Sequence, residues 1–147
     1  NNLLKKKIKI KVIGNLNKFP NKLKLKIKKV ENLTKSFGKI QINMALNYGS
    51  RQEIIGAIKK LKNKNIIINK KNLEKNLYTS GIPDPDILIR TGNTNRISNF
   101  LIWQSIYSEI FFEPKMWPDF SSKDFDRIIR KFQNINRNFG GLSVRNK

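Results

Sequence analysis

The chain contains no cysteine and no histidine, and only 10 of its 147 residues are acidic. Without cysteine it can form neither a disulfide framework nor a zinc–thiolate site, which is compatible with the cytoplasmic location that we predict. No apolar run approaches the roughly 18 to 20 residues that cross a bilayer, and the first residues lack the apolar core of a signal peptide. These absences predict a chain that is soluble or only peripheral to a membrane.

Basic residues are abundant: 31 Lys and Arg give a formal net charge of +21. Such an excess favours anionic partners, namely nucleic acid, acidic lipid headgroups or phosphorylated substrates. The lysines are scattered, however, and Lys, Asn and Ile all have AT-rich codons, so the charge also fits a bias of genome composition. No aromatic or glycine pattern of a nucleic-acid-binding module accompanies it. We therefore predict no nucleic-acid partner, and keep a basic nucleic-acid-binding protein as an alternative.

Strand and helix periodicities alternate along the chain. Strands are expected at 8–12, 40–46, 87–89 and 106–112, and helices at 20–38, 50–61, 69–77, 98–103 and 121–132. Asn69, Ser50-x-x-Glu53 and Ser121-x-x-Asp124 have the spacing of helix N-caps. This order predicts an α/β fold, with a mostly parallel sheet flanked by helices on both faces. The length suits a single domain, which we place at residues 1–147.

The segment from residue 86 to residue 103 has the residue types of a diphosphate site. Arg90 follows the short apolar strand at 87–89, Gly92 permits a sharp turn, and Ser98 is expected to cap a helix. In open α/β sheets ligands bind at the carboxyl ends of strands, where a helix N-terminus adds free N–H groups. Arg90, Arg96 and Ser98 are therefore candidate ligands for a diphosphate. Alternatively, the two arginines are solvated surface charges.

Several motifs occur in a familiar order. From Arg90 the chain reads Arg-Thr-Gly-Asn-Thr-Asn-Arg-Ile-Ser-Asn-Phe, and Trp103-Gln104 and Tyr107-Ser108-Glu109 follow. Further motifs are Asn47-Tyr48-Gly49-Ser50-Arg51, Trp117-Pro118-Asp119-Phe120 and Phe139-Gly140-Gly141. In these motifs, and along nearly its whole length, the chain resembles the C-terminal portion of the cis-prenyltransferases, in particular the undecaprenyl diphosphate synthases.

The resemblance implies an activity. Cis-prenyltransferases condense isopentenyl diphosphate onto an allylic diphosphate, commonly farnesyl diphosphate, and the resemblance implies a product such as undecaprenyl diphosphate, the lipid carrier of the bacterial wall. It further implies that Arg90, Arg96 and Ser98 bind the diphosphate of isopentenyl diphosphate, and that Glu109 helps to hold Mg²⁺. A homodimer and a peripheral membrane contact are also expected. On the residues alone, Glu109 is either an exposed carboxylate or one that needs a metal ion or an arginine partner among its apolar neighbours.

The chain departs from the family pattern in two places. Asn93-Thr94 stands where most members have Gly-Glu, and Asn95 where some members have a histidine. The opening Asp-Gly-Asn-x-Arg-Trp-Ala motif, whose aspartate carries the chemistry, is absent. We therefore predict no catalytic residue here, interpret the chain as the C-terminal portion of a longer protein, and expect it to be inactive alone. A short paralogue and a non-catalytic partner subunit are the alternatives.

Overall fold

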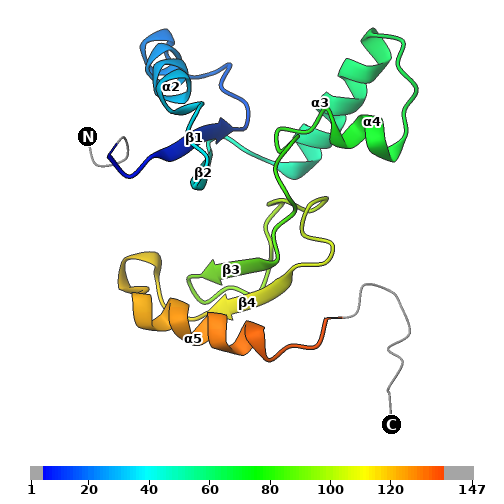
Figure 1. The fold of residues 1–147 in the computed structure, drawn as a ribbon. Helices are drawn as coiled ribbons and strands as arrows, with labels where there is room; N and C mark the ends of the chain where they lie inside the picture. Colours follow the sequence, from blue (N-terminus) through cyan, green and yellow to red (C-terminus); the bar gives the residue numbers. More distant parts are fainter. Residues whose placement is uncertain (1–4, 138–147) are drawn as a thin grey trace. The chain divides into compact units, whose positions relative to one another are not determined.

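The computed structural model describes residues 5–137, which divide into a compact unit up to residue 82 and another from residue 83 onward. Each unit contains one pair of parallel strands accompanied by helices (Figure 1). The predicted α/β class and parallel strand direction are thus confirmed, with the strands paired two by two where the sequence predicted one sheet. The placement of residues 1–147 in a single domain stays a prediction. The predicted Phe139-Gly140-Gly141 motif lies outside the described residues.

The first unit follows the predicted order of elements. They are β1 (Ile8–Ile13), α2 (Asn21–Thr34), β2 (Ile40–Ala45), α3 (Ser50–Asn63) and α4 (Lys70–Glu74). β1 and β2 pair in parallel register from Ile8 opposite Ile40 to Ile13 opposite Ala45. α2 forms the crossover between them, and its side chains accept two backbone N–H groups of β1: Ile10 donates to Thr34 Oγ1 at 3.1 Å and Val12 to Glu31 Oε1 at 2.8 Å. These bonds satisfy backbone N–H groups of β1 that do not pair with β2.

A glycine closes β1. Gly14 has φ +118°, and a Cβ at this position would lie 2.1 Å from the carbonyl oxygen of Leu46. The backbone segments around Gly14 and Leu46 approach closely because Leu46 N–H donates to the Ile13 carbonyl at 2.9 Å, just beyond the end of β2. Only glycine tolerates both the positive φ and this contact, so the end of β1 at Gly14 has a steric cause.

The buried face of α3 is partly polar. Its buried positions are Ser50, Glu53, Ala57 and Leu61, whereas Ile55 is 53% exposed. The predicted capping box is wrong, because Gly49 is the N-cap and no side chain caps the helix. Glu53 instead accepts the Tyr48 hydroxyl at 2.5 Å and the Tyr78 N–H at 2.6 Å. A buried carboxylate needs such donors, which long-range contacts supply here.

The second unit contains β3 (Ile87–Thr91), β4 (Glu109–Glu113), the 3₁₀ helix η1 (Trp117–Asp119) and α5 (Ser122–Gln133). The strands pair in parallel, from Ile87 opposite Glu109 to Thr91 opposite Glu113. Two of the three caps predicted from sequence form: Ser121 and Asp124 make a reciprocal capping box on α5, and in the first unit Asn69 accepts the Asn72 N–H at 2.9 Å. α5 buries Ile128, whereas Phe125 on the same helix is 46% exposed.

The helix predicted from Ser98 to Trp103 does not form. Residues 98–107 make successive turns, and Ser98, Asn99 and Leu101 have φ values of 47°, 61° and 46°. An α-helix needs consecutive right-handed residues, which these left-handed conformations interrupt. Ser98 is therefore no N-cap, and among the described residues no helix begins there. The strand predicted at 106–112 is likewise shorter, and begins at Glu109.

None of the helices in the described part of the chain has the length and apolar character of a membrane-spanning segment.

Candidate active site

Arg90 is held at the carboxyl end of β3. It lies opposite Phe112 in the strand register, and its side chain is half-buried. After one more residue, Gly92 turns the chain with φ +91°, as the sequence predicted. The turn brings Thr94 back to the strand, where Arg90 Nε donates to Thr94 Oγ1 at 3.0 Å. The guanidinium is thus oriented by a residue of its own turn.

An apolar cavity adjoins Arg90. It has a volume of about 190 Å³ and lies between β3 and the segment 97–101. Apart from Arg90, its lining is apolar, and includes Leu88, Ile97, Phe100 and Leu101. A largely apolar hollow with one cationic group suits a ligand that combines a hydrocarbon part with an anionic head.

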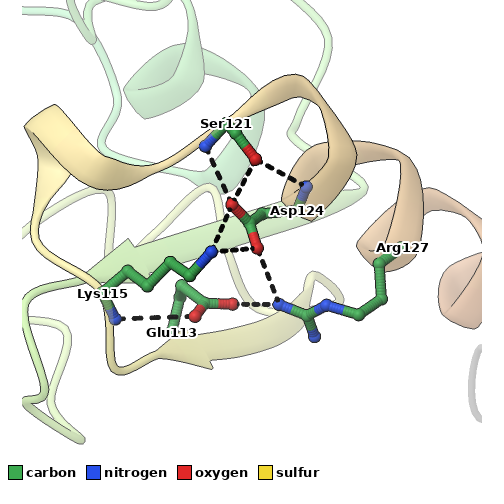
Figure 2. A network of polar contacts seen from close by, with 5 residues as sticks. All are labelled: Glu113, Lys115, Ser121, Asp124 and Arg127. Carbon is green, nitrogen blue, oxygen red and sulfur yellow. Dashed lines mark hydrogen bonds and ion pairs between the residues drawn. The ribbon is translucent and has the colours of Figure 1, made fainter.

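The turn that follows Arg90 is anchored to the end of β4. Gly92 N–H donates to the Lys115 carbonyl at 2.8 Å, and Asn93 N–H donates to the Glu113 carbonyl at 3.4 Å. The same two residues belong to the polar network shown in Figure 2. Lys115 Nζ contacts both Asp124 oxygens, at 2.8 and 2.9 Å, and Arg127 pairs with Glu113. The network therefore joins β4 and α5 to the turn beside Arg90.

Asp124 accepts more hydrogen bonds than Glu113, the other carboxylate of this network. It accepts hydrogen bonds from Lys115, from the Ser121 hydroxyl at 2.6 Å and from the Ser121 N–H at 2.9 Å. Above all the bond from Lys115, and then those from Ser121, hold the pKa of the Asp124 carboxyl well below its usual range. Asp124 is therefore ionised whenever the protein is near neutral pH.

We expect this lowered pKa to make stability depend on pH. A carboxyl whose pKa is lowered in the folded chain stabilises it fully above the unfolded pKa of about 3.9, and this contribution is lost as the pH falls toward the folded value. The urea midpoint of unfolding should thus decrease from about pH 5 to about pH 2. Asp124→Asn should be less stable at neutral pH and should flatten this dependence. Asp126→Asn, an exposed position on the same helix, is the matched control and should retain it.

Arg96 and Ser98 lie in the exposed segment that follows the turn. Neither side chain makes a hydrogen bond or ion pair within residues 5–137, so no such bond joins either of them to Arg90. Both groups are accessible to a ligand. Their predicted role in diphosphate binding stays a prediction.

Glu109 lies at the opposite end of the strand pair from Arg90. It is the first residue of β4 and stands opposite Ile87, three register positions before the Arg90–Phe112 pair, or about 10 Å at 3.3 Å per residue. Its carboxylate is 34% exposed and lies 4.0 Å from Arg137 Nε. Arg137 also pairs with Asp86 at 2.6 Å. An arginine partner therefore relieves the burial of this carboxylate.

The described residues do not by themselves form a magnesium site. No group of three potential ligand side chains from Asp, Glu, His or Cys gathers among residues 5–137. Mg²⁺ demands near-octahedral oxygen coordination, and Glu109 supplies a single carboxylate that already faces an arginine. The role of Glu109 in metal binding stays a prediction.

Sequence reasoning missed the groups that hold Arg90 in place. Thr94 gave a weak signal, as the departure from the usual glutamate, but its contact with Arg90 depends on the turn geometry. The side-chain contacts of Lys115 and Glu113 gave no signal in the sequence, because their partners Asp124 and Arg127 lie 9 and 14 residues away along the chain.

A protein-family model matches nearly the whole chain. Residues 1–140 match the model of a family described as "Putative undecaprenyl diphosphate synthase". The chain belongs to this prenyltransferase family. The cis-prenyltransferase resemblance found in the sequence is thereby confirmed.

Individual prenyltransferases show the same relation. The chain is 46% identical over 140 residues to a tritrans,polycis-undecaprenyl-diphosphate synthase (geranylgeranyl-diphosphate specific) of Picrophilus torridus, covering 90% of this chain and 55% of the relative. It is 43% identical over 142 residues to an isoprenyl transferase of Fusobacterium nucleatum, covering 96% and 61%. The chain thus spans little more than half the length of these relatives.

Two solved prenyltransferase structures share the fold. A probable undecaprenyl diphosphate synthase of Campylobacter jejuni superposes with a TM-score of 0.85 at 39% identity, over 93% of this chain and 65% of the other. A lavandulyl diphosphate synthase of Lavandula x intermedia, in complex with dimethylallyl diphosphate, gives 0.85 at 30% identity, over 91% and 61%.

Proposed function

We propose that the protein elongates a cis-prenyl chain by condensing isopentenyl diphosphate with an allylic diphosphate. A carbon–carbon bond forms between the two substrates, the allylic C–O bond breaks to release pyrophosphate, and the isopentenyl unit loses a proton. Arg90, Arg96 and Ser98 are proposed to hold the diphosphate of isopentenyl diphosphate. No residue of this chain is proposed to carry the proton transfer.

The position of Arg90 beside the apolar cavity is the observation that carries the proposal. Isopentenyl diphosphate has a five-carbon hydrocarbon part and an anionic head, and these match the apolar lining and the guanidinium respectively. A planar guanidinium matches phosphate oxygens bidentately, which an ammonium group does not. The family to which the chain belongs supports the same substrate class.

The allylic substrate is proposed to be farnesyl diphosphate and the product undecaprenyl diphosphate, the carrier lipid of the bacterial wall. Geranylgeranyl diphosphate is a second candidate, because relatives at 46%, 43% and 44% identity are named as specific for it. The proposal includes Mg²⁺ as a companion of the substrate phosphates, because this ion binds phosphate oxygens with one or two carboxylates. It extends to a cytoplasmic homodimer with a peripheral membrane contact and no nucleic-acid partner.

Incorporation of labelled isopentenyl diphosphate into butanol-extractable product tests the proposal. The full-length protein should incorporate label with farnesyl or geranylgeranyl diphosphate as acceptor, and the preferred acceptor should react at least tenfold faster. EDTA should abolish incorporation, and added Mg²⁺ should restore it. If neither acceptor supports incorporation in the presence of Mg²⁺, the proposed function is wrong.

A further inference from the structure

Arg90 uses only one of its donor groups to bond to the turn that follows it. Its Nε donates to Thr94 Oγ1 at 3.0 Å. Among residues 5–137, its two terminal Nη groups make no hydrogen bond or ion pair. A guanidinium is planar and carries five N–H donors in a fixed fork, so a bond at Nε sets the direction in which both Nη groups point. The Thr94 contact thus fixes the orientation of the fork and leaves its outer side available.

Thr94 has a defined position because the residues before it are bonded to β4. Gly92 and Asn93 have φ values of 91° and 51°, and their N–H groups donate to the carbonyls of Lys115 and Glu113 at 2.8 and 3.4 Å. The Thr94 hydroxyl therefore stands on a turn that is tied to a strand and, through the network of Figure 2, to α5. An anchored acceptor can orient a long side chain that solvent would otherwise leave free to rotate.

The acceptor is also neutral. A carboxylate at this position would pair with Arg90 and offset part of its positive charge. A hydroxyl orients the guanidinium and leaves its full charge for an anionic ligand. The chain thus has an orienting group at one of the positions where its sequence departs from the family pattern described above.

We infer that Thr94 is a positioning residue, which orients the Arg90 fork so that both Nη groups meet the diphosphate of isopentenyl diphosphate. This inference rests on the proposed function. It assigns Thr94 no contact with the substrate itself, so its effect should pass entirely through Arg90.

Thr94→Val is the informative substitution, because valine has nearly the shape of threonine but accepts no hydrogen bond. We expect it to raise the KM for isopentenyl diphosphate, and the dissociation constant of inorganic pyrophosphate measured by calorimetry, by about fivefold, the equivalent of one hydrogen bond. The kcat should change less than twofold. Thr94→Ser keeps the hydroxyl and should remain within twofold of the wild type. Circular dichroism melting checks that both variants are folded.

A double-mutant cycle with Arg90→Ala separates positioning from any other role. In the Arg90→Ala background, Thr94→Val should have no further effect on pyrophosphate binding. An undiminished effect in that background, or an unchanged KM in folded Thr94→Val, would overturn the inference. Should Thr94→Val misfold, Thr94→Ala takes its place in the same cycle. If Arg90→Ala itself leaves isopentenyl diphosphate incorporation unchanged, the proposed function fails, which is a distinct outcome.

Discussion

Replacing Arg90 with alanine is expected to lower kcat/KM for isopentenyl diphosphate by about 10²- to 10⁴-fold. Two charge-assisted hydrogen bonds from the guanidinium would be lost, each worth about 1.5–3 kcal/mol, and about 1.4 kcal/mol corresponds to a factor of ten. Stability should change little, because the Thr94 bond is the one hydrogen bond that Arg90 makes through its side chain within residues 5–137. The measurement is steady-state incorporation of labelled isopentenyl diphosphate, with the melting temperature recorded alongside.

Two further variants show whether the fork or the charge matters. Arg90→Lys keeps the positive charge but loses the planar pair of donors, so at least a tenfold loss should remain. Arg130→Ala removes an exposed arginine of α5, and it should retain wild-type activity. A loss of only twofold in Arg90→Ala would count against the role of Arg90 in diphosphate binding. Similar losses in Arg90→Ala and Arg130→Ala would indicate a general effect of charge.

Local signals predicted most of the fold. β1 and β2 follow from alternating apolar residues, and the starts of α4 and α5 from Asn69 and from Ser121 with Asp124, because caps depend on residues within one turn of the helix. The turn at Gly92 likewise follows from the one residue type that adopts its φ readily.

The errors arose where distant contacts decide the structure. Glu53 was assigned to a helix cap, but Tyr78 lies 25 residues away and draws its carboxylate into a buried site. Serine is a residue type that favours helix N-caps, and Ser98 was therefore expected to cap a helix. Left-handed residues follow it instead, and residue type alone does not specify these backbone conformations. For the candidate site, the sequence predicted the position of Arg90 at the end of a strand. It did not predict that Thr94 and the polar network fix the orientation of Arg90, because a hydroxyl–guanidinium contact depends on the path of the turn.

The pair between Glu113 and Arg127 is expected to dominate the stability of the second unit. The Glu113 side chain is 6% exposed, whereas that of Arg127 is 46% exposed. Arg127→Met would leave the buried carboxylate without its cationic partner, while methionine keeps much of the aliphatic stem. Removing one partner of a fully buried pair costs about 3–5 kcal/mol, and the partial exposure of Arg127 lowers our expectation to about 2–3 kcal/mol of unfolding free energy. Urea unfolding at neutral pH, followed by circular dichroism, measures this loss.

The neutral variant Glu113→Gln identifies the cause of that loss. If the uncompensated carboxylate destabilises Arg127→Met, then Glu113→Gln combined with Arg127→Met should be more stable than Arg127→Met alone, which is a favourable coupling in a double-mutant cycle. Arg130→Met, three residues further along the exposed side of α5, should stay within about 0.5 kcal/mol of the wild type. Equal losses in Arg127→Met and Arg130→Met would contradict the assignment. Arg127 holds the Glu113 side chain, and the backbone carbonyl of Glu113 accepts the Asn93 N–H of the turn that orients Arg90 through Thr94. Folded Arg127→Met should therefore also raise the KM for isopentenyl diphosphate.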